Sequence, residues 1–374
     1  MTAANIRPEY ATGAIPSLDG IRAVAVALVF LAHSGLEKII PGGLGVTIFF
    51  VLSGYLITTL MRIEHLRSGA INYRGFYLRR LLRLMPPLFI VVAVTAGLAA
   101  FSIIDGEFTP TGMAAALFYF GNYHVIAHDF HGMPAGLGVV WSLAIEEHYY
   151  LFYPPLAALL LRVGRVGLSV TLLSLFCFAV LAWRYWLVFH GASEDYLTMA
   201  TDTRVDAILI GCLMALWRNP WLDPVPARRA TNDWSIAAIC IAVLVGTLIY
   251  RNEVFRLTAR YSLQSLAIAP LIYLAVARAD RLPFRWLNAR PLVYIGSISY
   301  TIYLSHHMIL LGLAKHWPQL SWIWLTLLGA LVTWAVAEPM RRWVELPCAK
   351  LRKRLHRKVI ASAPASTLAS VGAP

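Results

Sequence analysis

Charged residues are scarce in this chain. Asp, Glu, Lys and Arg make up 14% of its 374 residues, whereas a soluble domain carries about 25%. Hydrophobic residues make up 59%, and the mean hydropathy is +0.65. This balance excludes an ordinary water-soluble globular protein and predicts a membrane protein with little room for a separate soluble domain.

Cysteine is also rare, and the positions of the cysteines argue against a cysteine metal site and against structural disulfides. The four cysteines show no spacing typical of a metal site, and they fall in apolar segments or near one membrane face, so structural disulfides are not expected: Cys177, Cys212, Cys240 and Cys348.

Internal repeats are lacking too. The first apolar run has no basic segment directly before it and no small-residue cleavage site after it, so we interpret it as a retained helix.

Long apolar runs dominate what is present. A bilayer core is crossed by about 20 apolar residues of helix. Ten segments approach this length: 21–36, 44–61, 85–104, 139–161, 167–189, 203–218, 234–250, 261–277, 292–314 and 321–343. The sequence therefore predicts an all-α, polytopic membrane helix bundle of about ten transmembrane helices. We expect the further apolar stretch 112–127 to be a re-entrant or interfacial segment on the outer side.

The net charge of +13 is interpreted as topology. If the spans alternate from a cytoplasmic N-terminus, most Lys and Arg residues between spans face the cytoplasm, which follows the positive-inside rule. Anionic lipids suffice as their partner, so no nucleic acid is expected. We predict a cytoplasmic segment 1–16, a membrane domain 17–346 and a cytoplasmic tail 347–374, basic and then disordered, with both termini in the cytoplasm.

The first apolar run, "SLDGIRAVAVALVFLAH", carries three ionisable groups. Asp19 and Arg22 open the run, and His33 follows Arg22 by eleven residues. Eleven helical steps end about 20° past three full circles and rise about 16 Å. Arg22 and His33 therefore share one helix face. Such groups are costly inside a bilayer, so a polar stripe here indicates function.

The next two segments carry a serine and an arginine group. Ser53 lies mid-span in "GGLGVTIFFVLSGYLI", where close helix packing by small residues is the simpler explanation. In "FYLRRLLRLMPPLF", Arg79, Arg80 and Arg83 stand at the predicted inner face. Such a group suits phosphate binding, although membrane anchoring by positive charge explains it equally simply.

Later spans add further polar residues. "WSLAIEEHYYLFYPP" places Glu146 and Glu147 about two turns inside a span that begins near Trp141. At least one of these carboxylates must be partnered or reach water, or both lie at the interface in solvent. The remaining candidates are Arg204, Tyr300, His306 and Glu338, from "TDTRVDAILIGCLMA", "GSISYTIYLSHHMIL" and "VAEPMRRWVELP". Helical rise places His33, Ser53, Glu146 and His306 between the midplane and the outer third, above the arginines.

Seven of these stretches, in this order, resemble the acyltransferase family 3 membrane enzymes: "SLDGIRAVAV" with its arginine and histidine, "IFFVLSGYLI", "FYLRRLLRLMPP", "WSLAIEEHYY", "RVDAILIGCLMA", "SISYTIYLSH" and "AEPMRR". The resemblance covers roughly residues 17–345. It implies a ten-helix core and transfer of acyl groups, usually acetyl from acetyl-CoA, to sugar hydroxyls. One departure is Val140, where many members carry a histidine before the tryptophan.

The resemblance implies that Arg22 and His33 are paired functional residues. We expect His33 to act as a general base or as a transient acyl carrier, with Glu146 or Glu147 orienting the imidazole or the acceptor. Arg79, Arg80, Arg83 and Ser53 are expected to bind the donor. The supporting positions are Asp19, Trp141, Arg204, Tyr300, His306 and Glu338.

The expected partners are acyl-CoA as co-substrate, a carbohydrate or glycoconjugate acceptor and the bilayer of a bacterial inner membrane, with no bound cofactor and no metal. Two alternatives stay open. One is acylation of a small molecule such as a macrolide. The other is a transporter or flippase, which also uses intramembrane charges but predicts repeats and broken helices.

Overall fold

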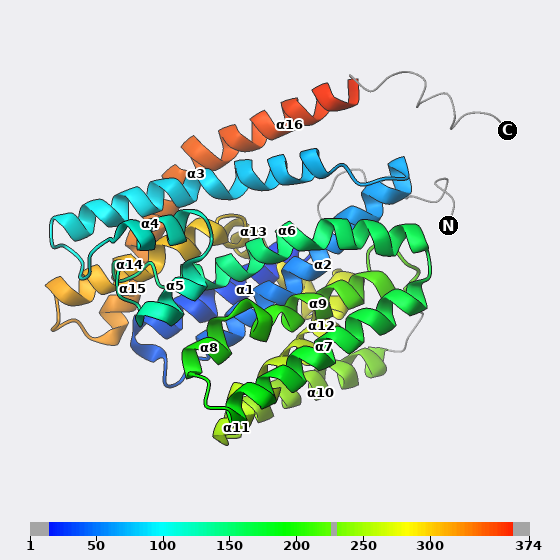
Figure 1. The fold of residues 1–374 in the computed structure, drawn as a ribbon, viewed down its shortest axis with the longest axis horizontal. Helices are drawn as coiled ribbons and strands as arrows, with labels where there is room; N and C mark the ends of the chain where they lie inside the picture. The colour runs from blue at the N-terminus through cyan, green and yellow to red at the C-terminus, as the bar shows by residue number, and fades with distance from the viewer. Residues whose placement is uncertain (1–14, 226–229, 362–374) are drawn as a thin grey trace.

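The fold was analysed in a computed structural model that describes residues 15–225 and 230–361. Every regular element in these residues is a helix, and they contain no strand. Most of the long helices run along the length of the molecule (Figure 1). The all-α bundle predicted from the sequence is therefore confirmed.

Eleven long helices form the bundle. They are α1 (Leu18–Leu31), α2 (Gly42–Ser68), α3 (Tyr73–Ala100), α6 (Val140–Val163), α7 (Val166–Phe189), α9 (Thr201–Trp217), α10 (Ala230–Ile249), α12 (Ala259–Ala277), α14 (Ser299–His316), α15 (Trp322–Met340) and α16 (Leu346–Ala361). Shorter helices and turns connect them: η3 (Ala32–Leu36), α4 (Pro110–Leu117), α5 (Gly121–His128), α8 (Glu194–Met199), α11 (Glu253–Leu257), η4 (Phe284–Asn288), α13 (Arg290–Ser297) and η5 (Arg341–Glu345).

Seven helical segments of the described chain are long and apolar enough to cross a membrane: 18–36, 42–68, 73–100, 166–189, 231–249, 259–277 and 322–352. Of the other three expected spans, two fold as the single helices α6 and α9, whereas 292–314 is divided at Ile298 between α13 and α14. However, α6 carries two glutamates, and α9 and α14 have 17 and 18 residues. The chain is a multi-pass membrane protein, while ten spans and cytoplasmic termini stay predictions, and 1–14 and 362–374 lie outside the described residues.

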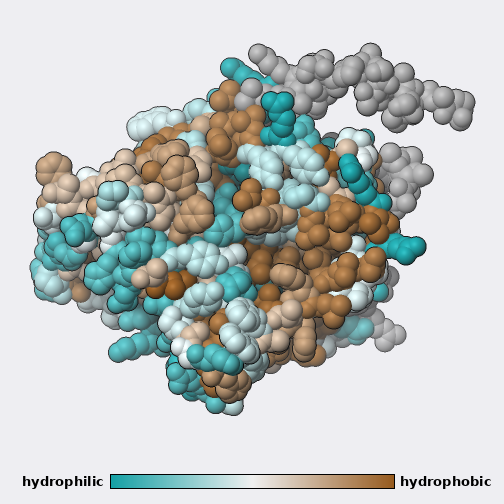
Figure 2. Space-filling model, in the orientation of Figure 1, coloured by the Kyte–Doolittle hydropathy of each residue, from teal (hydrophilic) through white to brown (hydrophobic). Residues whose placement is uncertain are grey.

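Burial separates the central helices from the outer ones. In the span of α2, 67% of the apolar window is buried inside the protein, compared with 17% in α7 and 22% in α10. Apolar surface covers much of the face shown in Figure 2. Side chains such as Phe178 and Ile239 are largely exposed on α7 and α10. These outer faces suit lipid, and the polar residues are gathered inside.

The close contact between α2 and α9 depends on two glycines. A Cβ atom on Gly54 would lie 1.9 Å from the carbonyl oxygen of Ile208, and one on Gly211 would lie 2.0 Å from that of Val51. Each is far inside van der Waals distance, so only glycine permits this approach of two backbones. The sequence "LSGYL" therefore serves helix packing at Gly54, directly after Ser53.

The stretch 112–127 does not form a span. It folds as α4 and α5, two helices of eight residues each, and each is about 12 Å long. Tyr119 lies in the turn between them with φ of +59°. That backbone conformation is unusual for an aromatic residue and occurs where the surrounding structure enforces it.

Candidate active site

Two cavities lie inside the bundle, and together they contain most of the predicted functional residues. The first, here called the arginine cavity, has a volume of about 80 Å³ and is lined by Arg22, Ser53, Arg80, Arg83, Tyr119, Ser142, Glu146, Glu147, Tyr150 and Tyr300 among others. The second, the histidine cavity, has a volume of about 680 Å³ and is lined by His33, Glu37, Trp141, Arg204, Arg260, Tyr261, Gln264 and His307 among others. The sequence predicted one polar core, and the structure divides it in two.

The arginine cavity holds two cations without an anionic partner. Arg80 lies over the ring of Tyr150 at 4.4 Å from its centroid, and neither Arg80 nor Arg83 forms an ion pair within the described part of the chain. Arg79 points elsewhere and pairs with Glu64 at 3.3 Å. Two of the three predicted arginines therefore face the cavity, and Arg79 does not.

The carboxylates of α6 take different positions in this cavity. Glu146 accepts hydrogen bonds from Ser53 at 2.9 Å and from the Tyr150 hydroxyl at 2.8 Å. Glu147 lines the cavity, and no hydrogen bond or ion pair of its side chain is found within the described residues. Ser53 is thus brought to Glu146, and Glu147 is left as a free acceptor.

Two tyrosines close the other side of the arginine cavity. The hydroxyl of Tyr300 donates to the carbonyl of Leu84 at 2.8 Å. Tyr119 is 8% exposed, and its hydroxyl has no hydrogen-bond partner within the described structure. Tyr119, in the turn between α4 and α5, therefore lines the same cavity as Arg80 and Arg83 from the first half of α3.

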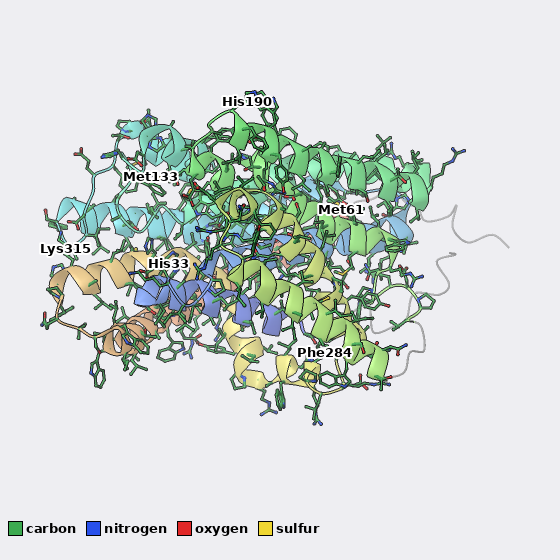
Figure 3. The ribbon with its side chains drawn as sticks, turned by 90° about the horizontal axis from the view of Figure 1, so that it is seen from below. His33, Met61, Met133, His190, Phe284 and Lys315 are labelled. Atoms are coloured by element: carbon green, nitrogen blue, oxygen red, sulfur yellow. The ribbon has the colours of Figure 1, made fainter. Side chains whose placement is uncertain are left out.

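The histidine cavity is built around the end of α1. The helix widens into η3 and then stops, because Gly35 adopts φ of +98°. His33 lies on this last turn beside α14 (Figure 3), and its side chain is exposed toward the cavity that it lines. Its Nδ1 lies 2.9 Å from Nε2 of His306, and its ring stacks on His307 at 4.4 Å between centroids. Three imidazoles from two helices therefore meet at one point.

The hydrogen bonds fix the tautomers of this cluster. Nδ1 of His306 lies 2.7 Å from the carbonyl oxygen of Tyr303, and a carbonyl only accepts, so this nitrogen carries the proton. In a neutral ring Nε2 of His306 must then accept, and Nδ1 of His33 must donate to it. This leaves the lone pair of His33 Nε2 free to take a proton or to attack a carbonyl carbon. The partner of His33 is therefore His306, not a glutamate.

A narrow wall separates the two cavities. Val46 and Tyr303 line both of them. The Tyr303 hydroxyl lies 2.6 Å from that of Ser142 and 3.2 Å from the carbonyl oxygen of Val139. Its ring meets Phe49 edge to face at 6.1 Å. The wall is thus held by one hydrogen-bonded tyrosine and by packing.

The remaining predicted residues occupy separate places. Arg22 donates to Asp19 at 2.7 Å, in the arginine cavity rather than beside His33. Trp141 and Arg204 line the histidine cavity. Glu338 lines neither cavity; it accepts from Tyr294 at 2.7 Å and pairs with Arg341 at 2.7 Å and with Arg342. Its contacts are those of an ion-pair network at the end of α15.

Sequence reasoning missed several residues of the site. Tyr119, Tyr150, Ser142, Tyr303 and His307 line a cavity or its wall. His307 follows a selected histidine, and Tyr150 and Ser142 lie within the "WSLAIEEHYY" stretch, so these had a local signal. Tyr119 had none, because its position depends on a backbone turn that the residue type does not predict.

Fold and cavities define a multi-pass membrane protein with a cluster of three histidines beside one cavity, and with arginines that line both cavities and form no ion pair within the described part of the chain. The model of a family described as an acyltransferase domain matches residues 15–337. The chain belongs to this acyltransferase family. No solved structure matches it.

The names of two similar proteins state an activity. The chain is 30% identical over 360 residues to the peptidoglycan O-acetyltransferase OatA of Listeria monocytogenes. The aligned region covers 91% of this chain and 57% of that protein. It is 30% identical over 358 residues to the O-acetyltransferase OatA of Staphylococcus aureus, covering 91% and 58%. This chain thus spans somewhat more than half the length of these relatives.

Proposed function

We propose that this chain is an integral-membrane O-acyltransferase of the bacterial inner membrane. It moves an acyl group, taken here to be acetyl, from acyl-CoA to a hydroxyl of a carbohydrate or glycoconjugate. The observation that carries the proposal is the free lone pair of His33 Nε2, held by His306 at the edge of a cavity of about 680 Å³. Cavities of roughly 300–1,000 Å³ are typical of small-molecule sites.

The arginine cavity supports acyl-CoA as the donor. Coenzyme A carries phosphates at one end and a long thin arm at the other. Arg80 and Arg83 offer two guanidinium groups that form no ion pair among the described residues, and a volume of about 80 Å³ is too small for the nucleotide. The phosphates would then stay at the predicted cytoplasmic mouth while the thioester moves toward His33.

The chemistry follows from the tautomer. As general base, His33 Nε2 takes the hydroxyl proton while the hydroxyl oxygen bonds to the acyl carbon and the carbon–sulfur bond breaks. The coenzyme A thiolate leaves and receives that proton. As carrier, Nε2 itself bonds to the acyl carbon while the carbon–sulfur bond breaks and the thiolate leaves. In a second step the hydroxyl oxygen bonds to the acyl carbon, the carbon–nitrogen bond breaks, and the hydroxyl proton passes through the released Nε2 to the thiolate. Both routes need His306 to accept from Nδ1 of His33.

The first test uses purified protein in proteoliposomes with radiolabelled acetyl-CoA. Because one relative is named a peptidoglycan O-acetyltransferase, peptidoglycan fragments are the first acceptor to supply, followed by other glycans. We expect release of coenzyme A together with base-labile acetate on the glycan. Label retained on the protein without acceptor would select the carrier route. If neither coenzyme A release nor glycan acetylation occurs with any acceptor, the proposal is wrong.

A second test concerns direction across the membrane. Single cysteines at Arg67 and Asp129, in a background without the four native cysteines, are exposed to a membrane-impermeant thiol reagent on intact cells. Only the cysteine at 129 should react. Reaction at 67 alone would place the arginine cavity on the side without coenzyme A, and the donor assignment would fail.

A further inference from the structure

Two arginines face the histidine cavity around one aromatic ring. Arg204, on the first turn of α9, is 2% exposed, and its guanidinium carbon lies 3.8 Å from the centroid of the Tyr261 ring. Arg260 lies 5.1 Å from the same centroid. All three residues line the cavity. Two cations thus share one ring at the cavity wall.

Neither cation is neutralised by the protein. Arg204 donates to the carbonyl of Thr198 at 2.9 Å and to the hydroxyl of Thr47 at 3.2 Å, and its Nε has no partner. Arg260 donates to the Tyr261 hydroxyl at 3.2 Å. Within the described residues no carboxylate forms an ion pair with either arginine, although Glu37 also lines the cavity.

Arg184 provides a comparison, because it is a buried arginine that has an ion-pair partner. Arg184 is fully buried, but it pairs with Asp206 at 2.7 Å, two residues after Arg204 in the chain. Arg184 also leaves its Nε without a partner, so unused N–H groups alone do not distinguish the two. The difference is the ion pair, because Asp206 pairs directly with Arg184 and no carboxylate forms an ion pair with Arg204 within the described residues.

Aromatic contacts do not remove this imbalance. Phe50 and Trp141 also lie within 5.8 Å of the Arg204 guanidinium, and a desolvated cation–π contact stabilises by about 2 kcal/mol. Burying one ion costs several kcal/mol after relaxation, and the usual compensation is an ion pair. An anion has room to bind beside these arginines, because both of them line the cavity of about 680 Å³.

We propose that the side of the histidine cavity lined by Arg204 and Arg260 is a subsite for an anionic substituent of the acceptor, a carboxylate or a phosphate ester on the sugar. The inference rests on the proposed function, since it assigns the acceptor to this cavity. The anion would accept from Arg204 and Arg260 in the charge-assisted geometry that arginine favours. Its sugar ring would then lie between this side and His33, with Trp141 and Gln264 among the lining side chains.

The test measures binding to purified wild-type protein in detergent. Three ligands are compared by saturation-transfer NMR with competition: a methyl hexoside, the matching methyl hexuronoside and the hexose 6-phosphate. We expect the better anionic ligand to bind at least about tenfold more tightly than the neutral sugar, which corresponds to one charge-assisted hydrogen bond. Whichever of the two anions binds more tightly identifies the substituent.

Three variants sharpen the test. Arg204→Gln and Arg260→Gln should each abolish most of the preference for the anion, and Arg204→Lys should keep part of it because the charge is retained. Arg251→Gln is the matched control; it removes an exposed arginine of the same predicted side, outside the cavity. Arg260→Gln remains informative if the variants at the buried Arg204 do not fold.

The outcomes separate the two proposals. Equal binding of neutral and anionic sugars, or an anion preference unchanged in Arg260→Gln, would overturn the subsite. Coenzyme A release with a glycan acceptor would still stand in that case. Absence of any acyl transfer, with anion preference intact, would instead overturn the enzyme assignment and leave a cationic binding site.

Discussion

The arginine and histidine cavities differ in how their polar groups are held. In the histidine cavity, His33 is fixed by a chain of hydrogen bonds through His306 to the carbonyl of Tyr303. In the arginine cavity, Arg80, Arg83 and Glu147 have no hydrogen-bond or ion-pair partner among the described residues. A reacting group requires one tautomer and one direction, whereas phosphate-binding groups gain by staying free until the ligand arrives. The comparison supports the proposed division, with chemistry in the histidine cavity and donor capture in the arginine cavity.

The strongest way to break this comparison is to remove the imidazole of His33. In His33→Ala we expect kcat to fall by at least about 100-fold, because general bases contribute roughly 10²–10⁴. The KM for acetyl-CoA should change little, since the arginine cavity is intact. Steady-state coenzyme A release measures both. His190→Ala is the control, an exposed histidine at the periphery (Figure 3), and activity of His33→Ala above a tenth of wild type would refute the role.

The next largest effect should come from the partner of His33. His306→Phe removes the acceptor for the Nδ1 proton, so the His33 ring can adopt the wrong tautomer, and we expect kcat to fall about 10- to 100-fold. His306→Gln should recover most of the activity, because its amide oxygen accepts the same proton. Equal losses in both variants would mean that His306 acts through packing only, without setting the tautomer.

A smaller effect is expected in the arginine cavity, and it should appear in KM. Arg80→Gln and Arg83→Gln should each raise the KM for acetyl-CoA about tenfold, the value of one charge-assisted hydrogen bond. The matched variant Arg79→Gln should change it less than about threefold, because Arg79 is paired with Glu64. Donors that lack the 3′-phosphate should lose less affinity in these variants. An Arg79 effect as large as that of Arg83 would contradict the assignment.

The smallest effect concerns the wall between the cavities. Tyr303→Phe and Ser142→Ala each remove the 2.6 Å hydrogen bond between the two hydroxyls, and each should lower the free energy of unfolding by about 1 kcal/mol. The double variant should lose clearly less than the sum of the two, as expected for partners in one contact. Additive losses in thermal unfolding would show that the two hydroxyls act independently.

The sequence predicted the helices and the polar residues well, but not how the residues are shared between cavities. The apolar runs and the motif order were enough for the all-α membrane bundle and for the acyltransferase family. Spacing of eleven residues predicted Arg22 and His33 on one helix face, but α1 ends at Leu31, His33 lies on η3, and the two residues line different cavities. The wall at Val46 and Tyr303, which puts them in different cavities, is formed by other helices and has no signal within α1.

The orientation of each helix about its own axis explains the other differences between the sequence prediction and the structure. Arg79 and Arg83, four residues apart, were expected to act together, but packing turns α3 so that Arg80 and Arg83 face the cavity. Likewise, the meeting of His33 with His306 depends on how α1 and α14 pack, which hydropathy does not determine. Tyr119 enters the site through a turn with positive φ, and such a conformation is not encoded by an aromatic residue.

The wall of Val46 and Tyr303 also bears on proton leakage across the membrane. A continuous file of water and ionisable groups from one face of the bilayer to the other would let protons run down their gradient, and each elementary charge that crosses dissipates about 2.3 kcal/mol per 100 mV. The glutamates and the imidazoles of this protein are the kinds of groups along which protons hop. Because Val46 and Tyr303 stand between the two cavities, they interrupt such a path, as the proposed transfer of an acyl group from one cavity to the other requires.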